Sequence, residues 1–130
     1  MIVDASVVTS ALFGDTHVSD WAREVVAAGQ VGAPHLMPVE VCQVLRRRVA
    51  GGVIASADAS AGLGDLLELR VDLYPFEPFA ERVWELRDTV SAYDAWYIAL
   101  AEARGAPLAT LDSRLARAPG PRCAFVLPEV

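Results

Sequence analysis

Short apolar runs alternate along this chain with longer segments in which apolar residues recur every three or four positions. Continuous apolar runs are typical of buried strands, whereas the longer spacing is typical of helices. The pattern predicts strands at residues 1–5, 31–36, 71–74, 107–111 and 122–127. It predicts helices at residues 20–28, 38–50, 56–69, 78–87, 91–104 and 113–118.

Strands and helices alternate through most of the chain, which is the pattern of an α/β fold. Apolar strands joined through helices form parallel sheets that are covered on both faces. We therefore expect a three-layer domain around a parallel sheet of about five strands. The length of 130 residues fits a single domain, residues 1–130. In such sheets, ligands bind beyond the carboxyl ends of the strands.

The composition excludes several classes of protein. Hydrophobic residues make up 54% of the chain and charged residues 22%, which is enough apolar material for a core and unlike a disordered chain. All 11 basic residues are arginines, so sites that need a lysine, such as the P-loop, are excluded. A net charge of −6 argues against nucleic-acid binding through bulk positive charge, but it is compatible with a metal-dependent nuclease.

The amino terminus and the cysteines indicate where the protein works. Met1–Asp4 carries no basic segment, and charged residues interrupt every apolar run before about 18 positions accumulate. We therefore expect a soluble, cytoplasmic protein with no membrane partner. Cys42 and Cys123 form no C-x-x-C motif, which argues against a zinc site or a redox pair. Both are expected to be buried reduced thiols.

Four acidic residues are expected to meet at one edge of the predicted sheet. Asp4 ends the first strand and Asp112 ends the fourth, and parallel strands present both carboxylates at the same edge. Glu40 lies in the first turn of its predicted helix. Asp94 is the fourth residue of a segment that begins at Ser91 and has the pattern of a capping box. The amino termini of helices that follow parallel strands face the same edge.

Each of these acids alone has an ordinary explanation as a turn residue, a helix cap or a partner of a helix dipole. Together they indicate a ligand, because like charges about 4 Å apart repel by about 4 kcal/mol at an effective dielectric constant of about 20. The chain has no lysine to neutralise them, and oxygen-only ligand sets suit Mg²⁺ or Mn²⁺. Such ions hydrolyse phosphodiesters by activating water, which is the chemistry of a nuclease.

The segments around these acids resemble the four acidic motifs of PIN domains, and are most similar to those of VapC toxins from bacterial toxin–antitoxin pairs. The residues that carry the resemblance are Ile2–Ser6, Pro34–Val41, Ala92–Glu102 and Leu108–Asp112. Their order, context and spacing extend the resemblance over nearly the whole chain.

The resemblance implies a five-stranded parallel sheet and an endoribonuclease that depends on Mg²⁺ or Mn²⁺ and uses Asp4, Glu40, Asp94 and Asp112. It also implies an RNA substrate, a cognate VapB-like antitoxin that blocks the cleft, and a homodimer. The chain departs from the family in one respect. The next acid after Asp112 is Glu129, so the additional downstream carboxylate of some PIN relatives has no counterpart and a second metal site stays open.

Four other residues are candidates for contact with the substrate. Arg47 follows Glu40 by seven positions, which places it on the same helix face, where it could bind a phosphate. It could equally belong to a solvated helix end, where its positive charge interacts favourably with the helix dipole. Ser6 and Thr110 lie two positions from Asp4 and Asp112 and could support them or their water, or be plain strand-end hydroxyls. Tyr93, beside Asp94, is a possible substrate contact.

The remaining residues receive no chemical role. The other aromatic residues, Tyr97 among them, are interpreted as core or as a partner surface. His17 and His35 have no partner at metal or triad spacing. The alternative to a nuclease is a catalytically inactive PIN-like module whose acidic cleft binds a cation or a partner protein.

Overall fold

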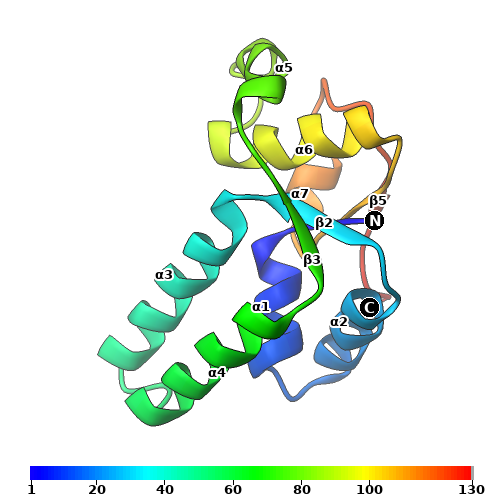
Figure 1. Ribbon diagram of the computed structural model, residues 1–130. Coiled ribbons are helices and arrows are strands. Elements are labelled where there is room, and N and C mark those ends of the chain that lie inside the picture. The colour runs from blue at the N-terminus through cyan, green and yellow to red at the C-terminus, as the bar shows by residue number, and fades with distance from the viewer. Residues whose placement is uncertain (130) are drawn as a thin grey trace.

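The computed structural model describes residues 1–129, so Val130, the last residue of the predicted domain, lies outside the described part. Its centre is a five-stranded sheet in which all neighbouring strands are parallel, in the order β3-β2-β1-β4-β5 (Figure 1). The strands are β1 (Ile2–Val3), β2 (Val31–Pro34), β3 (Val71–Tyr74), β4 (Leu108–Ala109) and β5 (Phe125–Val126). The predicted parallel α/β fold is confirmed.

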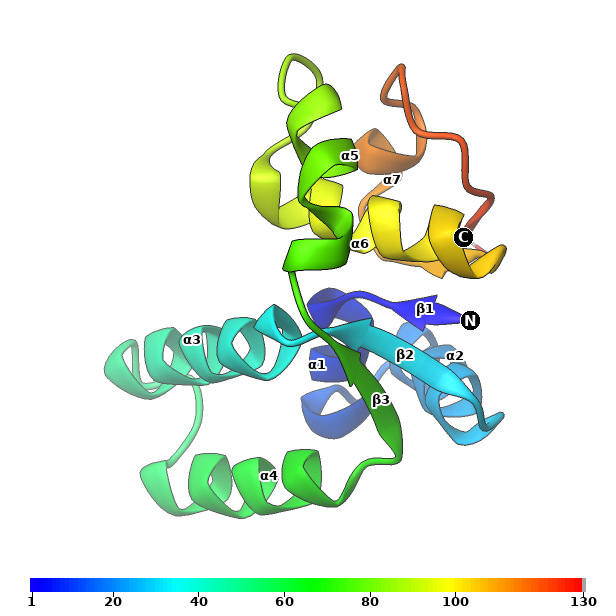
Figure 2. The ribbon, with the colours of Figure 1, turned by 45° about the horizontal axis from the view of Figure 1, so that its top comes forward.

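Helices cover both faces of this sheet, as Figure 2 shows. One face carries α1 (Ala5–Phe13), α2 (His17–Ala27), α3 (Leu36–Ala50) and α4 (Ser56–Glu68). The other carries α5 (Ala80–Glu85), α6 (Ala92–Arg104) and α7 (Ser113–Ala116), and the 3-10 turn η1 (Glu77–Phe79) precedes α5. Helices α3 and α4 form a pair that projects beyond the sheet (Figure 1).

The core lies between the central strands and helices α1 and α6. Every residue of β1, β2 and β4 is buried, because these strands are covered from both faces. Most residues of α6 from Ala95 to Ala101 are buried as well, which fixes this helix firmly against the sheet. Strand β3 is an edge strand, and Asp72 and Leu73 in it are exposed.

Helix α1 is the element that the pattern of the sequence did not predict. It begins directly after Asp4, whose side chain accepts the backbone N–H groups of Ser6 and Val7 and so caps the helix. The helix is rich in β-branched residues, and Val7 and Val8 are fully buried. Its polar residues, Ser6, Thr9 and Ser10, are small and uncharged and Thr9 is buried, so the helix lacks the charged face that marks an amphipathic helix.

Helices α1 and α4 approach each other closely at Gly62. A Cβ atom at this position would lie 1.9 Å from a ring carbon of Phe13. Only glycine leaves room for the ring, so the contact explains a residue that is unfavourable within a helix.

Several sequence-based boundaries and burial expectations need correction. Helix α3 begins at Leu36, so Glu40 lies in its second turn and not in its first. The helix expected at 78–87 is a 3-10 turn followed by the short helix α5. The expectation of two buried thiols is wrong, since Cys42 is exposed and Cys123 is half-buried. Within residues 1–129 no helix has the length and apolar character that a membrane span requires.

Candidate active site

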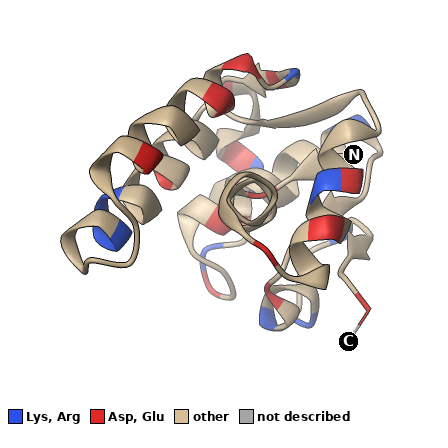
Figure 3. Ribbon diagram, turned by 90° about the horizontal axis from the view of Figure 1, so that it is seen from below, with Lys and Arg blue, Asp and Glu red and all other residues tan. Residues whose placement is uncertain are grey.

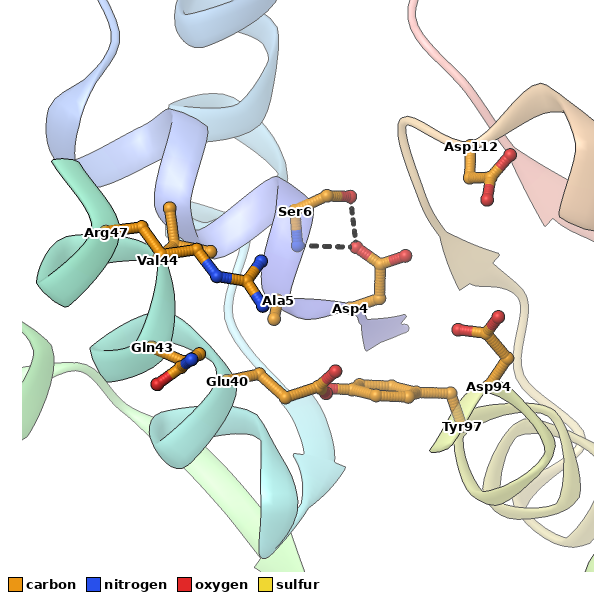
Figure 4. A pocket seen from close by; sticks show the side chains of 10 residues that line it. All are labelled: Asp4, Ala5, Ser6, Glu40, Gln43, Val44, Arg47, Asp94, Tyr97 and Asp112. Carbon is orange, nitrogen blue, oxygen red and sulfur yellow. Dashed lines mark hydrogen bonds between the residues drawn. The ribbon is translucent and has the colours of Figure 1, made fainter. Parts of the chain in front are cut away.

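All four predicted acids line one pocket of about 350 Å³ beyond the carboxyl ends of β1 and β4. Segments far apart in the sequence bring them there: the start of α1, the first half of α3, the start of α6 and the start of α7 (Figure 4). We call this the acidic pocket. Its lining consists of Asp4, Ala5, Ser6, Glu40, Gln43, Val44, Arg47, Asp94, Tyr97 and Asp112.

Asp4 is the most constrained of the four acids. Its Oδ1 accepts the backbone N–H of Ser6 at 2.8 Å and also the Ser6 hydroxyl (Figure 4), and its Oδ2 accepts the hydroxyl of Thr110. Burial raises the pKa of Asp4, and the hydrogen bonds from Ser6 and Thr110 lower it without cancelling the effect of burial. The carboxylate is thus held in one orientation in a poorly hydrated position.

Ser6 and Thr110 connect the ends of the two central strands. The Ser6 hydroxyl accepts the N–H of Leu111 at 3.2 Å, and the fully buried Thr110 hydroxyl accepts the N–H of Asp112 at 3.0 Å. Each hydroxyl therefore accepts from the β4 side and donates to Asp4. The sequence placed both residues beside the acids, and the structure brings them together around Asp4.

Glu40 is bonded across the pocket to a residue that the sequence analysis assigned to the core. The hydroxyl of Tyr97 donates to Glu40 Oε1 at 2.8 Å. Burial, followed by the charge of Glu40, raises the pKa of Tyr97 far above its ordinary value, so the phenol stays protonated as a donor. Burial also raises the pKa of Glu40, to which the charges of Asp94 and Asp4 contribute further. Tyr97 follows Asp94 by three positions, a helical spacing that could have signalled its place in the site.

Asp94 and Asp112 lie at helix starts but differ in their local bonds. Ser91 caps α6 by accepting the N–H of Asp94 at 3.2 Å, and the Asp94 carboxylate faces the pocket (Figure 4). Burial raises the pKa of Asp94, and the charges of Asp4 and Asp112 add to this shift. Asp112 caps α7 by accepting the N–H of Arg114 at 2.9 Å, and its side chain is 41% exposed. Asp112 therefore has both a capping role and a place in the pocket.

Little positive charge offsets these acids. Arg47 is the one basic residue in the described pocket lining, and among residues 1–129 it forms no salt bridge with any of the four acids. Arg114 approaches only Asp112, with Nε 3.7 Å from Oδ1. The pocket is therefore a site of concentrated negative charge that a cation would stabilise.

The donor chemistry fits a hard divalent cation, because every acidic ligand is a carboxylate. The side chains are not preassembled, since no group of three or more His, Cys, Asp or Glu residues in the described chain is close enough to hold an ion as it stands. Asp4 is fixed by its hydrogen bonds, whereas the carboxylates of Asp94 and Asp112 are not bonded to it. Binding an ion between three of the acids would therefore require their side chains to move closer together.

The remaining candidates are placed differently by the structure. Arg47 lines the pocket together with Gln43 and Val44, as the helical spacing predicts. The run of arginines that contains it lies at the far end of α3, where Figure 3 shows basic segments near the tip of the projecting helix. Tyr93 does not line the pocket and is 63% exposed. Neighbouring residues in a helix point in different directions, which separates Tyr93 from Asp94.

Comparisons with known proteins identify the family. The PIN domain family model matches residues 1–121. Ribonuclease VapC1 of Mycobacterium tuberculosis is 42% identical over 127 residues, which cover 97% of this chain and 96% of that protein. Ribonuclease VapC9 of the same species is 40% identical over 115 residues, which cover 88% and 87%.

Solved structures share the fold. The structure of Mycobacterium tuberculosis VapC20, described as a toxin that cleaves the sarcin–ricin loop, superposes with a TM-score of 0.68 at 18% identity and covers 89% of this chain and 92% of that one. VapBC2 from Rickettsia felis, bound to a DNA fragment from its promoter, gives a TM-score of 0.68 at 14% identity over 97% and 96% of the two chains. At these identities the likeness concerns the fold alone.

Proposed function

Because the chain belongs to the PIN domain family and, within it, to the VapC ribonucleases, we propose that it is a metal-dependent endoribonuclease that acts as the toxin of a toxin–antitoxin pair. One observation carries the proposal. Asp4, Glu40, Asp94 and Asp112 line a single pocket at the carboxyl edge of the sheet, with little positive charge around them. We further propose that residues 1–130 form one domain that works in the cytoplasm.

We propose Mg²⁺ as the cofactor, with Mn²⁺ as a substitute, held by the carboxylates of Asp4, Glu40, Asp94 and Asp112. When bound, such an ion supplies positive charge that activates water and stabilises the leaving oxygen of a phosphodiester. The chain's own contribution is orientation. Ser6 and Thr110 fix Asp4, and burial keeps water away from this carboxylate, which strengthens its interaction with a cation.

The decisive experiment compares wild-type protein with Asp94→Asn on a pool of total bacterial RNA, with Mg²⁺, with Mn²⁺ and with a chelator. We expect discrete cuts that require both the metal and Asp94. Asp58→Asn in α4 is the control, because it makes the same chemical change at an exposed position outside the pocket. A folded wild-type protein that makes no metal-dependent cuts would favour the inactive interaction module, an alternative to which the names of the relatives give no support.

For the substrate side of the pocket, we propose that Arg47 binds a phosphate of the RNA. Arg47→Glu should then lower the cleavage rate, and Arg46→Glu is its control because it makes the same charge change outside the pocket lining. Equal rates for the two variants would assign Arg47 to the solvated helix end. Tyr93 remains a weaker candidate for contact with the substrate beyond the pocket.

The partner we propose is a VapB-like antitoxin, with the toxin itself forming a homodimer. Solved relatives include a member of the VapBC family of toxin–antitoxin systems from Mycobacterium tuberculosis. An anionic pocket without substrate attracts an arginine side chain, which can form paired hydrogen bonds with carboxylates. We therefore expect the antitoxin to insert an arginine there. Full inhibition by an antitoxin without arginines would contradict this expectation.

A further inference from the structure

We infer that Tyr97 is a positioning residue of this site: its hydroxyl fixes the Glu40 carboxylate, so that one oxygen is anchored and the other faces the pocket. The inference rests on the proposed metal-dependent function. Tyr97 lies on α6 and Glu40 on α3, so the 2.8 Å hydrogen bond between them joins two walls of the acidic pocket. In Figure 4 the Tyr97 ring extends from the Asp94 side of the pocket to the carboxylate of Glu40.

Tyr97 and Glu40 differ in conformational freedom, and this difference decides which residue positions the other. Tyr97 is only 2% exposed and lies in the most buried helix, so its ring is fixed by the core. Glutamate has more rotamer freedom than most side chains, and Glu40 lies at the edge of the pocket. The rigid phenol therefore determines where the flexible carboxylate lies.

Charge explains why Glu40 needs such an anchor. The negative charges of Asp94 and Asp4 face it from the start of α6 and the end of β1 and oppose its ionised form. Within residues 1–129 the Tyr97 hydroxyl is the one hydrogen-bond donor bound to the Glu40 carboxylate. Without this donor, repulsion would favour orientations of Glu40 that point out of the pocket.

A purely structural explanation treats Glu40 as nothing more than the acceptor that satisfies a buried phenol. The two explanations differ in one respect. If Tyr97 acts through Glu40, removing the hydroxyl weakens metal binding only when Glu40 is present. If the hydroxyl serves only the fold, its removal changes the stability of the protein and leaves the Mn²⁺ affinity of the folded protein unchanged.

The test is a cycle of four proteins: wild type, Tyr97→Phe, Glu40→Ala and the double variant. Mn²⁺ affinity is measured by isothermal titration calorimetry on antitoxin-free protein, and thermal unfolding reports whether each variant is folded. Tyr97→Phe should weaken Mn²⁺ binding about tenfold or more, the usual effect of losing a residue that orients a metal ligand. In the Glu40→Ala background it should have no further effect.

RNA cleavage by the same proteins gives an independent readout. We expect Tyr97→Phe to lower kcat and to leave KM for RNA nearly unchanged, because the hydroxyl orients a site residue and does not hold the substrate. Tyr74→Phe is the matched control, since it removes a phenol hydroxyl from β3, outside the pocket lining.

Three results would overturn the inference. The first is a Tyr97→Phe protein that binds Mn²⁺ as tightly as wild type, and the second is an effect of Tyr97→Phe that persists undiminished in the Glu40→Ala background. Wild-type protein that binds no Mn²⁺ would reject the metal site and this inference together. Wild-type protein that binds Mn²⁺ but cuts no RNA would reject only the proposed activity, and the Tyr97 comparison would still be decided by Mn²⁺ affinity.

Discussion

The carboxylates of the acidic pocket and the carboxylate of Glu102 differ in what surrounds them. In the acidic pocket, burial raises the pKa of Asp4, Glu40 and Asp94, and no hydrogen bond from an arginine side chain reaches any of these three in the described chain. On α6, near its carboxyl end, Glu102 is half-buried, with 15% of its side chain exposed, and it accepts two bonds from Arg82, at 2.7 and 3.1 Å.

The Glu102 cluster, defined as Arg82, Glu102, Gly120 and Arg122, is a neutralised site. The backbone N–H of Arg122 donates to Glu102 at 2.7 Å, and Arg82 also donates to the carbonyl of Gly120 at 2.9 Å. Burial pushes the pKa of Glu102 upward, but the hydrogen bonds from Arg82 and Arg122 outweigh it and lower the pKa. The cluster ties α5 and the segment before β5 to α6.

The comparison teaches how function and stability divide the acids of this chain. A carboxylate that meets an arginine and backbone donors holds the fold together. Buried carboxylates without an arginine partner destabilise the fold in their ionised form, and they retain the capacity to bind an external cation. The two groups should therefore respond in opposite ways to neutralisation.

The largest expected effect is on activity, from Asp4→Asn. The asparagine can keep the acceptor for Ser6 and Val7, and its amide can donate to Thr110, so the helix cap survives. The site loses a charge, and cleavage should fall at least about a hundredfold, as when an electrostatic group is removed from a reacting centre. Urea unfolding of the metal-free protein should show no loss of stability. If Asp4→Asn were destabilised but cut RNA at a near-normal rate, Asp4 would serve the stability of the fold and not the activity.

The next effect is on stability, from Glu102→Gln. The variant loses the charge-assisted bonds to Arg82 and should lower the free energy of unfolding by about 1–3 kcal/mol, with cleavage unchanged when folded. Glu85→Gln is the matched control, because Glu85 also bonds Arg82 at 3.2 Å but is 52% exposed. An exposed pair of this kind contributes under about 1 kcal/mol. Equal losses in the free energy of unfolding would show that Glu102 stabilises the fold no more than the exposed Glu85 does.

The smallest effect, and the sharpest test, is the dependence of stability on pH. The pKa of Asp4 is raised above its ordinary value of 3.8, so its contribution to stability is present below that value and is lost as pH rises through the raised pKa. The pKa of Glu102 is lowered, so its contribution is present above 4.5 and is lost as pH falls through the lowered pKa.

These opposite signs can be measured in metal-free protein. As pH falls, wild type should gain stability relative to Asp4→Asn and lose its advantage over Glu102→Gln. Each unit of pH changes either difference by at most about 1.4 kcal/mol. Urea unfolding at a series of pH values gives both curves. If both stability differences changed with pH in the same direction, Asp4 and Glu102 would not have pKa values shifted in opposite directions.

The sequence was sufficient to predict the parallel sheet and the meeting of the four acids at one of its edges, because strand ends and helix starts are local features. Asp4 and Asp112 follow apolar runs, and parallel pairing then brings them to one edge. The position of Glu40 was placed one turn too early. Pro38 suggested a helix start, but it is the third residue of α3, where a missing N–H costs nothing.

The features that the sequence did not predict depend on tertiary packing. Helix α1 contains no charged residue, and its β-branched valines are more typical of a strand than of a helix. The partner of Tyr97 lies 57 positions away, so its place in the site depends on how α6 packs against α3. The sequence indicated Tyr93 as a substrate contact because it is the neighbour of Asp94, but Tyr97, one turn further along α6, is the tyrosine that lines the pocket.

The hydrogen bond between Thr110 and Asp4 has a consequence for synthesis of the protein. It joins residues 106 positions apart, and Asp112 lies further along the chain still. A nascent chain therefore exposes Asp4 early but gains its complete set of acids only after nearly all of the coding sequence has been translated. A chain that ends before this point lacks Asp112 and the Thr110 hydroxyl that fixes Asp4, so its set of acids is incomplete.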